Sequence, residues 1–396
     1  RGLGDVYKRQ VWDISPQKGG TERITSTLCT EFRREGHKCY LVYKTNLDPN
    51  FELCEFDGKF KIGANTSDED IIKYLLDNKI NVIHIQSNFL FVRRIRKIRD
   101  INHLSLKIIF SHHFEPGWEE RSVSMSDILL DVRQAITGFS KLVHIIRLFL
   151  YPINRLRISY LNHKYYRLSY ENTDNVVLLS KYFFNKYMQY MKMTDVSKLR
   201  SIPNALSFNE FLPFIEISKK EKIVLIVSRL EETQKRISSA LKIWVDLYSY
   251  TSVENWKLYI IGAGRYNEYY KKIVKKHRLT NVFFEGIRDP KPYYVKASLF
   301  MMTSESEGWG LTLTEAMQFG CVPIAFDNYD SLKDIIINDY NGVLVSRNQQ
   351  SDYVDAMLSL MIDHSCRNLL AHQAINFSRK FAIKEVAHQW LNLYKE

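Results

Sequence analysis

The feature that most constrains the fold is a repeated alternation of short apolar runs with amphipathic helical patterns. The strand-length runs are a stub ending at Ile14 and residues 38–44, 80–86, 107–112, 175–180, 222–228, 257–262, 281–286, 298–304, 322–327 and 342–346. Helical patterns fall between them at residues 20–35, 68–78, 234–250, 267–277, 329–338 and 351–363. Such alternation predicts an α/β fold with parallel sheets covered by helices on both faces.

The chain has 396 residues, which suits two doubly wound, Rossmann-like domains better than one. The alternation is interrupted between residues 202 and 213, where Pro203 and Pro213 flank an irregular segment. We therefore expect an N-terminal domain over residues 11–205 and a C-terminal domain over residues 206–380. We interpret residues 1–10, RGLGDVYKRQ, as a non-native leader, because they resemble translated cloning sequence and do not fit the pattern that follows.

Composition excludes several classes of protein. The five cysteines show neither CxxC spacing nor a Cys/His pattern, which argues against a zinc site and indicates a reducing compartment. No apolar run approaches the roughly 18 residues of a spanning helix, and no signal peptide is visible. The net charge of +12 is spread widely, without a zinc-finger, RNP or basic-zipper pattern, so we expect no nucleic-acid partner. An anionic substrate or an anionic membrane accounts for the charge equally well.

Residues 122–170 depart from the alternation, being helical, basic and aromatic. The favoured interpretation is a helical excursion that packs on its own domain. The alternative is a face that lies on the inner membrane surface.

The strongest motif follows the apolar run at 298–304 and extends from Ser304 to Ala316. It contains Gly308 and Gly310 and then opens a helix. In open α/β sheets, ligands bind beyond the carboxyl ends of strands, and a helix N-terminus there suits a diphosphate. Glu307 and Glu315 are spaced so that both could accept hydrogen bonds from sugar hydroxyls. For Glu315 a purely structural role is equally open, because TLTE at 312–315 is a capping-box pattern.

A second motif, Ser228-Arg229-Leu230 followed by Lys235, comes at the end of the first strand of the second domain. Two cations at a strand terminus and the next helix start can neutralise a departing diphosphate. A solvated helix face is the ordinary alternative, and the position in the same sheet as Glu307 favours function.

Weaker signals lie at glycine pairs and histidines. Gly19-Gly20 follows the first strand, and Gly262-Ala263-Gly264 follows another; each alone indicates only a turn. His112 and His113 end a strand, where an imidazole could hydrogen-bond a sugar hydroxyl or a nascent oxyanion. His84, inside a strand, is assigned to packing or to the floor of a cleft.

Taken together, these motifs resemble glycosyltransferase family 4, also called glycosyl transferases group 1. The resemblance covers nearly the whole chain after Gln10 and is most specific at Glu307-x7-Glu315, continuing through EAMQFGCVPIAF and Asn341-Gly342. It implies a GT-B fold, with two Rossmann-like domains facing across a cleft. It also implies that the last helix, within residues 381–396, packs back on the N-terminal domain.

The resemblance assigns roles residue by residue. Glu307 would contact the donor sugar, Glu315 the ribose, and Arg229 with Lys235 the diphosphate. His113 matches the cleft histidine through its H-x-x-P context, with His112 leaving that register uncertain by one. The expected catalytic residues are His113, Glu307, Arg229 and Lys235. The expected donor-binding residues are Gly19, Gly20, Arg229, Lys235, Gly286, Glu307, Gly308, Trp309, Gly310, Leu311 and Glu315. No metal or other cofactor is expected beyond the donor itself.

The function implied is retaining transfer of a hexose from a nucleoside diphosphate sugar to a glycan or lipid-linked acceptor, in cell-surface polysaccharide biosynthesis. We expect a cytoplasmic enzyme, with peripheral contact to the inner face of an anionic membrane. Two alternatives remain open: a catalytically lapsed nucleotide-sugar-binding protein of the same fold, and a sugar-nucleotide epimerase. Binding without turnover would support the first, and the epimerases usually lack the E-x7-E arrangement.

Overall fold

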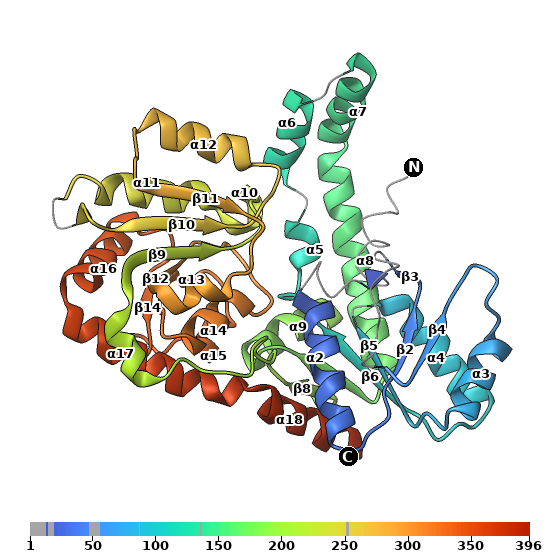
Figure 1. Cartoon of the computed structure of the whole chain (residues 1–396). Helices are drawn as coiled ribbons and strands as arrows, with labels where there is room; N and C mark the ends of the chain where they lie inside the picture. The colour runs from blue at the N-terminus through green and yellow to red at the C-terminus, as the bar shows by residue number, and fades with distance from the viewer. Residues whose placement is uncertain are drawn as a thin grey trace. The chain divides into compact units, whose positions relative to one another are not determined.

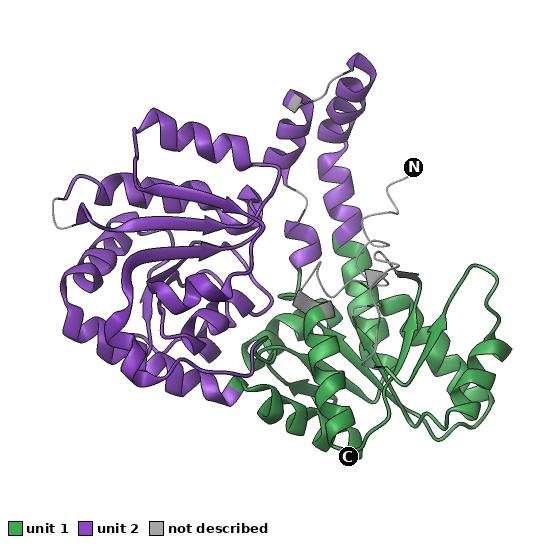
Figure 2. Cartoon of the chain, in the orientation of Figure 1, with its two compact units in different colours: residues 1–117, 159–207, 381–396 green, residues 118–158, 208–380 purple. Residues whose placement is uncertain are grey.

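The computed structural model describes residues 13–14, 20–46, 56–86, 88–122, 124–134, 137–250 and 253–396. Gly19 and residues 1–10 lie outside the described residues, as do the side-chain surroundings of Gly20. The chain forms two compact units, shown in Figure 2. Unit 1 contains residues 1–117, 159–207 and 381–396, and unit 2 contains residues 118–158 and 208–380.

Unit 2 is built on a parallel six-stranded sheet, labelled in Figure 1. Its strands, in spatial order, are β11 (Val282–Gly286), β10 (Lys257–Ile261), β9 (Glu221–Val227), β12 (Ala297–Met302), β13 (Val322–Phe326) and β14 (Val343–Val345). Numbered along the unit this is the order 3-2-1-4-5-6, which reverses direction between β9 and β12. The central strands are buried on both faces, which explains why they read as continuous apolar runs rather than alternating ones.

The connections of this sheet are helical. They are α10 (Glu232–Lys235), α11 (Ile237–Leu247), α12 (Asn267–Lys276), α13 (Lys291–Lys296), α14 (Leu311–Gln318), α15 (Leu332–Ile335), α16 (Gln350–Ile362) and α17 (His364–Ser378). The core helix α11 buries Leu241, Trp244 and Leu247 completely. Its apolar positions recur at helical spacing, so one face covers the sheet.

Unit 1 carries a parallel four-stranded sheet in the order β5 (Val82–Gln86), β6 (Lys107–His112), β7 (Asn175–Leu178) and β8 (Leu199–Ser201). Two short parallel pairs accompany it: β1 (Asp13–Ile14) with β3 (Thr45–Asn46), and β2 (Tyr40–Tyr43) with β4 (Gly58–Lys61). Its helices include α2 (Gly20–Arg34), α3 (Asp68–Asp77), α4 (Phe89–Ile101), α9 (Phe184–Met191) and α18 (Ile383–Lys395).

The last helix, α18, belongs to unit 1 although it comes at the far end of the sequence. Tyr394 Oη lies 3.1 Å from His84 Nδ1, and the ring of Trp390 lies 4.4 Å from that of His84. The carbonyl of Leu393 accepts a hydrogen bond from Lys107 Nζ. These contacts fix α18 against the strands β5 and β6.

The units differ from the predicted domains in one segment, residues 118–158, which group with unit 2. This segment contains α5 (Trp118–Arg121), α6 (Met125–Gln134), α7 (Gly138–Phe149) and the beginning of α8 (Tyr151–Glu171). Polar side chains of α6 bond to loops of the unit 2 sheet, and these contacts explain the grouping. Among the residues that the structure describes, no helix is both long and apolar enough to cross a membrane.

Candidate active site at the sheet switch point

The two strongest motifs follow the two strands that flank the reversal of strand order in unit 2. Arg229 and Lys235 come after β9, and Glu307 comes after β12. These strands are hydrogen-bonded neighbours, with Phe300 opposite Leu225. Their carboxyl ends therefore bring the motifs to one edge of the sheet, at the position where open α/β sheets bind ligands.

Glu307 and Lys235 form an ion pair that is mostly withdrawn from solvent, with side chains 9% and 14% exposed. The carboxylate also accepts a hydrogen bond of 2.7 Å from Ser304 Oγ. A buried carboxylate requires such partners, because desolvation strongly disfavours an isolated charge. Lys235 is therefore held at the switch point by an acid from the neighbouring strand's loop.

Gln234 connects this pair to Arg229. Its amide nitrogen donates to Glu307 Oε2 at 3.3 Å and to the main-chain carbonyl of Ser306 at 3.0 Å. Its amide oxygen accepts from Arg229 Nη2 at 2.9 Å. The sequence analysis missed Gln234, although it lies within the segment between the two cations.

Arg229 itself remains largely open to solvent. Its side chain is 62% exposed and also bonds to Glu231 at 3.0 Å. The site thus combines one fixed cation, Lys235, with one exposed cation, Arg229. An incoming diphosphate could recruit the exposed guanidinium without breaking the buried pair.

Gly310 sets the start of α14. It is the N-cap residue and has φ +91°, a conformation that an L side chain rarely adopts. Leu311 and Thr312 donate no backbone hydrogen bond within the described chain, so two N–H groups at this helix start stay available. Such a terminus favours an anion. Gly308, Trp309 and Leu311 surround this turn, and Trp309 is buried.

The capping-box interpretation of Glu315 is wrong, because Gly310 is the cap and no side chain caps α14. Glu315 is fully buried within the helix and accepts a 3.0 Å hydrogen bond from Tyr294 Oη of α13. Glu315 thus bonds to α13, whereas Glu307, in the loop before α14, bonds to α10.

The glycines after β10 allow close packing between neighbouring loops. A Cβ on Gly262 would lie 1.9 Å from the Ser228 carbonyl oxygen, and one on Gly264 would lie 2.3 Å from that of Leu230. The N–H of Gly262 donates to Gly286, which ends β11 with φ +70°. Gly262 and Gly264 therefore seat the Ser228-Arg229-Leu230 turn, a structural role that their spacing alone did not indicate.

In unit 1, His112 is buried in an aromatic cluster. Its Nε2 lies 3.1 Å from Tyr166 Oη, which also accepts the N–H of Gly117 at 2.8 Å. With Nε2 as the acceptor, Tyr166 Oη accepts from Gly117 and donates to His112, an arrangement that suits a neutral imidazole. Burial lowers the pKa of His112 to about 3, with a further contribution from His113.

His113 follows β6 and differs from its neighbour in having no protein hydrogen bond. Both of its ring nitrogens are buried and unpartnered among the described residues. Burial lowers the pKa of His113 to about 4. Because His84 bonds to Tyr394 and Ser111 and His112 bonds to Tyr166, His113 is the histidine of this group with free hydrogen-bonding capacity at both nitrogens.

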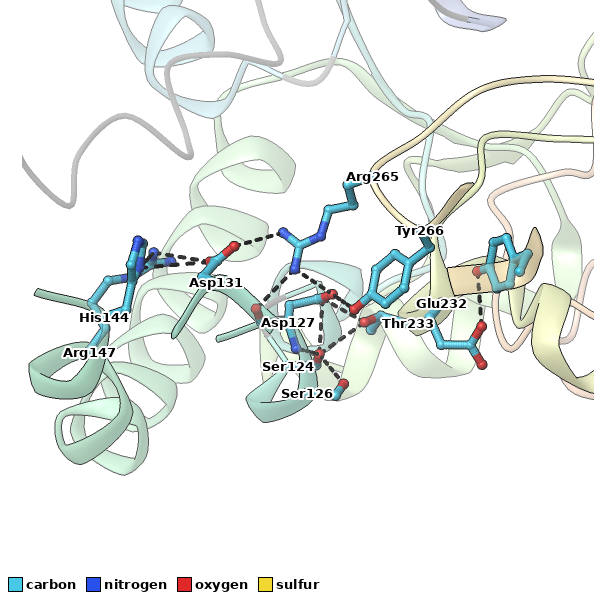
Figure 3. Close-up of polar contacts among 11 residues, drawn as sticks. Ser124, Ser126, Asp127, Asp131, His144, Arg147, Glu232, Thr233, Arg265 and Tyr266 are labelled. Atoms are coloured by element: carbon cyan, nitrogen blue, oxygen red, sulfur yellow. Dashed lines mark hydrogen bonds and ion pairs between the residues drawn. The ribbon is translucent and has the colours of Figure 1, made fainter. Parts of the chain in front are cut away.

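Helix α6 is bonded to the loop that carries the site cations, as Figure 3 shows. Asp127 accepts from Thr233 Oγ1 at 2.5 Å and from Tyr266 Oη at 2.7 Å. Arg265 lies 3.3 Å from Asp127 and 3.2 Å from Asp131. Burial, together with the Asp127 carboxylate, raises the pKa of Tyr266. Since Thr233 directly precedes Gln234, α6 is tied to the residues that position Glu307.

The structure therefore joins Arg229, Lys235 and Glu307 in one network and places Gly308, Trp309, Gly310 and Leu311 directly after it. Gly286 lies at the end of β11, which is separated from β9 by β10. Gly19 and the surroundings of Gly20 lie outside the described residues. His113 belongs to unit 1 and Glu307 to unit 2, so their joint action stays a prediction. In the described part of the chain, no group of three His, Cys, Asp or Glu residues is arranged to hold a metal ion.

The second segment of unit 2 matches a known protein family. Residues 207–380 match the family model described as "Glycosyl transferases group 1". This range contains Arg229, Lys235, Glu307 and Glu315, and it coincides closely with the second segment of unit 2.

Two curated relatives are glycosyltransferases by description. An uncharacterized glycosyltransferase of Haemophilus influenzae is 22% identical over 384 residues, covering 94% of this chain and 95% of that protein. An α-1,4-N-acetyl-D-galactosaminyltransferase of Campylobacter jejuni, which acts on a diNAcBac-PP-undecaprenol-linked glycan by its name, is 24% identical over 233 residues. That match spans 58% of this chain and 62% of the relative, which is less than two thirds of its length.

A solved structure shares the fold over nearly the whole chain. Anabaena HepE in complex with UDP superposes with a TM-score of 0.72 at 14% identity, covering 97% of this chain and 98% of HepE. The fold is thus the mixed α/β, parallel-sheet arrangement of the GT-B glycosyltransferases, with two Rossmann-like units. Together, the family match and the relatives support a glycosyltransferase; the narrower assignment to family 4 stays a prediction.

Proposed function

We propose that this protein is a retaining glycosyltransferase that moves a hexose from a nucleoside diphosphate sugar to a glycan or lipid-linked acceptor in cell-surface polysaccharide biosynthesis. The observation that carries the proposal is the network Arg229–Gln234–Glu307–Lys235 at the switch point of the unit 2 sheet. It provides two cations, one partly buried carboxylate and an open helix N-terminus within two neighbouring loops.

Each part of this network suits one part of the donor. The N–H groups of Leu311 and Thr312, with Arg229, would bind the diphosphate. Lys235 would stabilise the negative charge that develops on the leaving diphosphate. Glu307 would accept a hydrogen bond from the donor sugar, while Ser304 and Gln234 keep the carboxylate in place. Glu315 would contact the ribose, as the family resemblance implies.

The acceptor side is assigned to unit 1. His113 would offer a neutral ring nitrogen to an acceptor or donor hydroxyl, because its lowered pKa keeps the imidazole uncharged at neutral pH. We propose that transfer needs no metal and no further cofactor, since the cations are supplied by side chains. The lipid-linked glycan named for the Campylobacter relative supports an acceptor of that kind.

We also propose a cytoplasmic location with peripheral contact to an anionic membrane at its inner face. Cys39, Cys321 and Cys366 are free thiols among the described residues, which suits a reducing compartment. A lipid-linked acceptor would bring the enzyme to that surface.

The test is a thermal-shift screen against UDP-, GDP-, ADP- and CMP-sugars, started with UDP because HepE is described with that nucleotide. Hits would be followed by release of the nucleoside diphosphate in the presence of acceptor and by the anomeric configuration of the product. We expect a stabilising donor whose effect disappears in Arg229→Ala. Binding without release would identify a lapsed enzyme, epimerised donor would identify an epimerase, and an inverted product would exclude retention.

A further inference from the structure

Helices α7 and α8 form one nearly continuous column, visible in Figure 1. The N–H of Leu150 donates to Ile146, and the N–H of Asn154 donates to Leu150, so helical hydrogen bonding continues through the junction. The column begins after Thr137, which caps α7 through Ser140. Residues on one side of α7 are therefore continued on the same side of α8.

One side of this column is apolar and exposed. Its large side chains recur at spacings of three or four residues: Phe139, Leu142, Ile146, Phe149, Ile153 and Leu156. Phe139 and Phe149 are each 79% exposed, and Leu156 is 74% exposed. At 100° per residue they form a single stripe, which we call the α7–α8 stripe. Single apolar side chains are often exposed on protein surfaces, whereas a continuous apolar stripe marks an interaction surface.

The opposite side of α7 is the one that contacts α6. Arg147 and His144 lie 3.4 Å and 4.0 Å from Asp131 of α6. Asp131 is bonded in turn to Arg265 of the β10–α12 loop. The column is thus anchored to unit 2 through its polar side, which leaves the stripe directed away from α6.

The charge around the stripe has one sign. From residue 132 to residue 170 the sequence contains seven Lys or Arg residues and no Asp or Glu. At 100° per residue, Arg157 and Lys164 lie on the side of the stripe; both are exposed and form no ion pair with any described residue. A long apolar face with basic residues and no acidic ones has the composition of a helix that lies in an anionic lipid interface.

We propose that the α7–α8 stripe docks on the surface of an anionic lipid bilayer. Phe139, Ile146 and Phe149 enter the boundary between headgroups and acyl chains, and Arg157 and Lys164 contact the headgroup phosphates. A second copy of this chain is the less suitable occupant, because a symmetric contact would bring two such basic segments together without acidic partners. The proposal deepens the proposed function by naming the surface through which the enzyme would reach a lipid-linked acceptor.

The test is flotation of the full chain with vesicles of phosphatidylcholine alone or mixed with phosphatidylglycerol, without donor or acceptor. We expect binding to the anionic vesicles that weakens with added salt. Phe139→Ser/Ile146→Ser/Phe149→Ser should reduce binding by more than about tenfold. Arg157→Gln/Lys164→Gln should reduce it on the order of fivefold per cation.

Matched controls remove the same groups elsewhere. Leu90→Ser/Ile362→Ser/Leu369→Ser changes three exposed apolar residues outside the stripe, and Lys275→Gln/Lys276→Gln removes two exposed cations from α12. Both should leave vesicle binding at the wild-type level. Equal losses in stripe and control variants, or no preference for anionic vesicles, would overturn the proposal. So would a wild-type dimer that the stripe variant converts to a monomer while neither binds vesicles.

This result is separable from the proposed function, because nucleotide-sugar binding is measured without lipid and vesicle binding without nucleotide. A stripe variant that keeps its donor-induced thermal shift is folded at the donor site. If the wild-type chain binds vesicles but no donor, the surface stands and the transferase proposal fails.

Discussion

The carboxyl edges of the two sheets hold different chemistry. In unit 2 the edge at β9 and β12 is charged, with Lys235 and Glu307 paired and Gln234 bonded to both Glu307 and Arg229. In unit 1 the edge at β6 is neutral and aromatic, with His112 bonded to Tyr166 and His113 unpartnered. The first edge is suited to an anion, and the second to hydroxyl groups.

The same position in two parallel sheets thus carries side chains of opposite character, charged in unit 2 and neutral in unit 1. Charged side chains stabilise a diphosphate most effectively when the protein already holds them in position. At the charged edge, Glu307 and its hydrogen-bond partners hold Lys235 in that way. Neutral imidazoles exchange hydrogen bonds with hydroxyls without adding charge to a buried site. Variants that exchange or remove these properties should therefore affect donor binding and transfer separately.

The largest effect should come from the charged edge. Glu307→Gln should lower the transfer rate on the order of 1,000-fold, because it removes the carboxylate that holds Lys235 and that we propose binds the donor sugar. Nucleoside diphosphate release under saturating donor measures it. Glu305→Gln, two residues away and bonded to Arg236 and Arg347, is the matched control and should stay near the wild-type rate. Equal losses in both variants would mean that the loop, and not the carboxylate, matters.

The ion pair of Lys235 and Glu307 should stabilise the fold only while both charges are present. Lys235→Met should lower the free energy of unfolding by about 3 kcal/mol, because it leaves the buried Glu307 charge without its cation. Lys235→Met/Glu307→Gln should recover most of that loss, since no uncompensated charge remains. Urea unfolding of both variants gives the comparison. A double variant as unstable as the single one would show that the pair is not electrostatically coupled.

The neutral edge should influence transfer without influencing the donor. His113→Asn should lower transfer about 100-fold, the usual size of a general acid–base or hydrogen-bonding contribution. The thermal shift caused by the nucleotide sugar should remain, because the donor network lies in unit 2. His388→Asn, at an exposed position of α18, controls for loss of an imidazole. A lost thermal shift in His113→Asn would contradict this separation of roles.

Acid should destabilise the neutral edge. His84 and His112 have pKa values lowered from 6.5 to about 3, and His113 to about 4, with burial as the main cause. Between these values the unfolded chain binds protons that the folded chain excludes, so the free energy of unfolding falls as the pH falls from 6.5. At a pH of about 5, each histidine should lower the free energy of unfolding by at most about 2 kcal/mol.

Thermal unfolding as a function of pH measures this loss. His112→Gln removes one of the titrating groups and should give a shallower dependence on pH than the wild type between pH about 5 and about 7. An unchanged slope would mean that these histidines do not control acid stability.

The smallest effect concerns the tie between α6 and the charged edge. Asp127→Asn should lower the free energy of unfolding by about 1 kcal/mol, because it weakens charge-assisted bonds to Thr233, Tyr266 and Arg265. It should also raise the donor concentration needed for half-maximal transfer by a few fold, since Thr233 precedes Gln234. Asp352→Asn, exposed at the start of α16, is the control. Identical donor dependence in Asp127→Asn and wild type would separate α6 from the site.

Much of this arrangement could be predicted from the sequence, because buried parallel strands leave apolar runs of characteristic length. Strand β6 begins and ends where the pattern placed it, and β9 is shifted by one residue. The strand β4, with sequence GKFK, was missed because its side chains alternate between half-buried and exposed and half of them are lysines. Sequence patterns reveal a strand through its buried side chains, and the two-stranded pair of β2 and β4 buries few of them.

The charged residues of the candidate site could be predicted from the sequence, but the hydrogen bonds that join them could not. Gln234 carries no charge and lies in a four-residue helix, so its bridging role follows only from the proximity of β9 and β12. The expected capping box failed because Gly310, with its positive φ, ends the loop one residue before α14. The grouping of residues 118–158 with unit 2 was equally beyond local patterns, since it depends on Asp127 meeting residues more than a hundred positions away.

The position of α18 has a consequence for how the protein is made. Strands β5 and β6 are translated well before α18, yet His84 and Lys107 contact that helix. At rates on the order of 10 residues per second, this surface of unit 1 stays uncovered for many seconds, while residues 208–380 are made and can begin to fold. Unit 1 would then be completed by a segment that is made after the body of unit 2, so that removal of α18 should damage the sheet of unit 1 first.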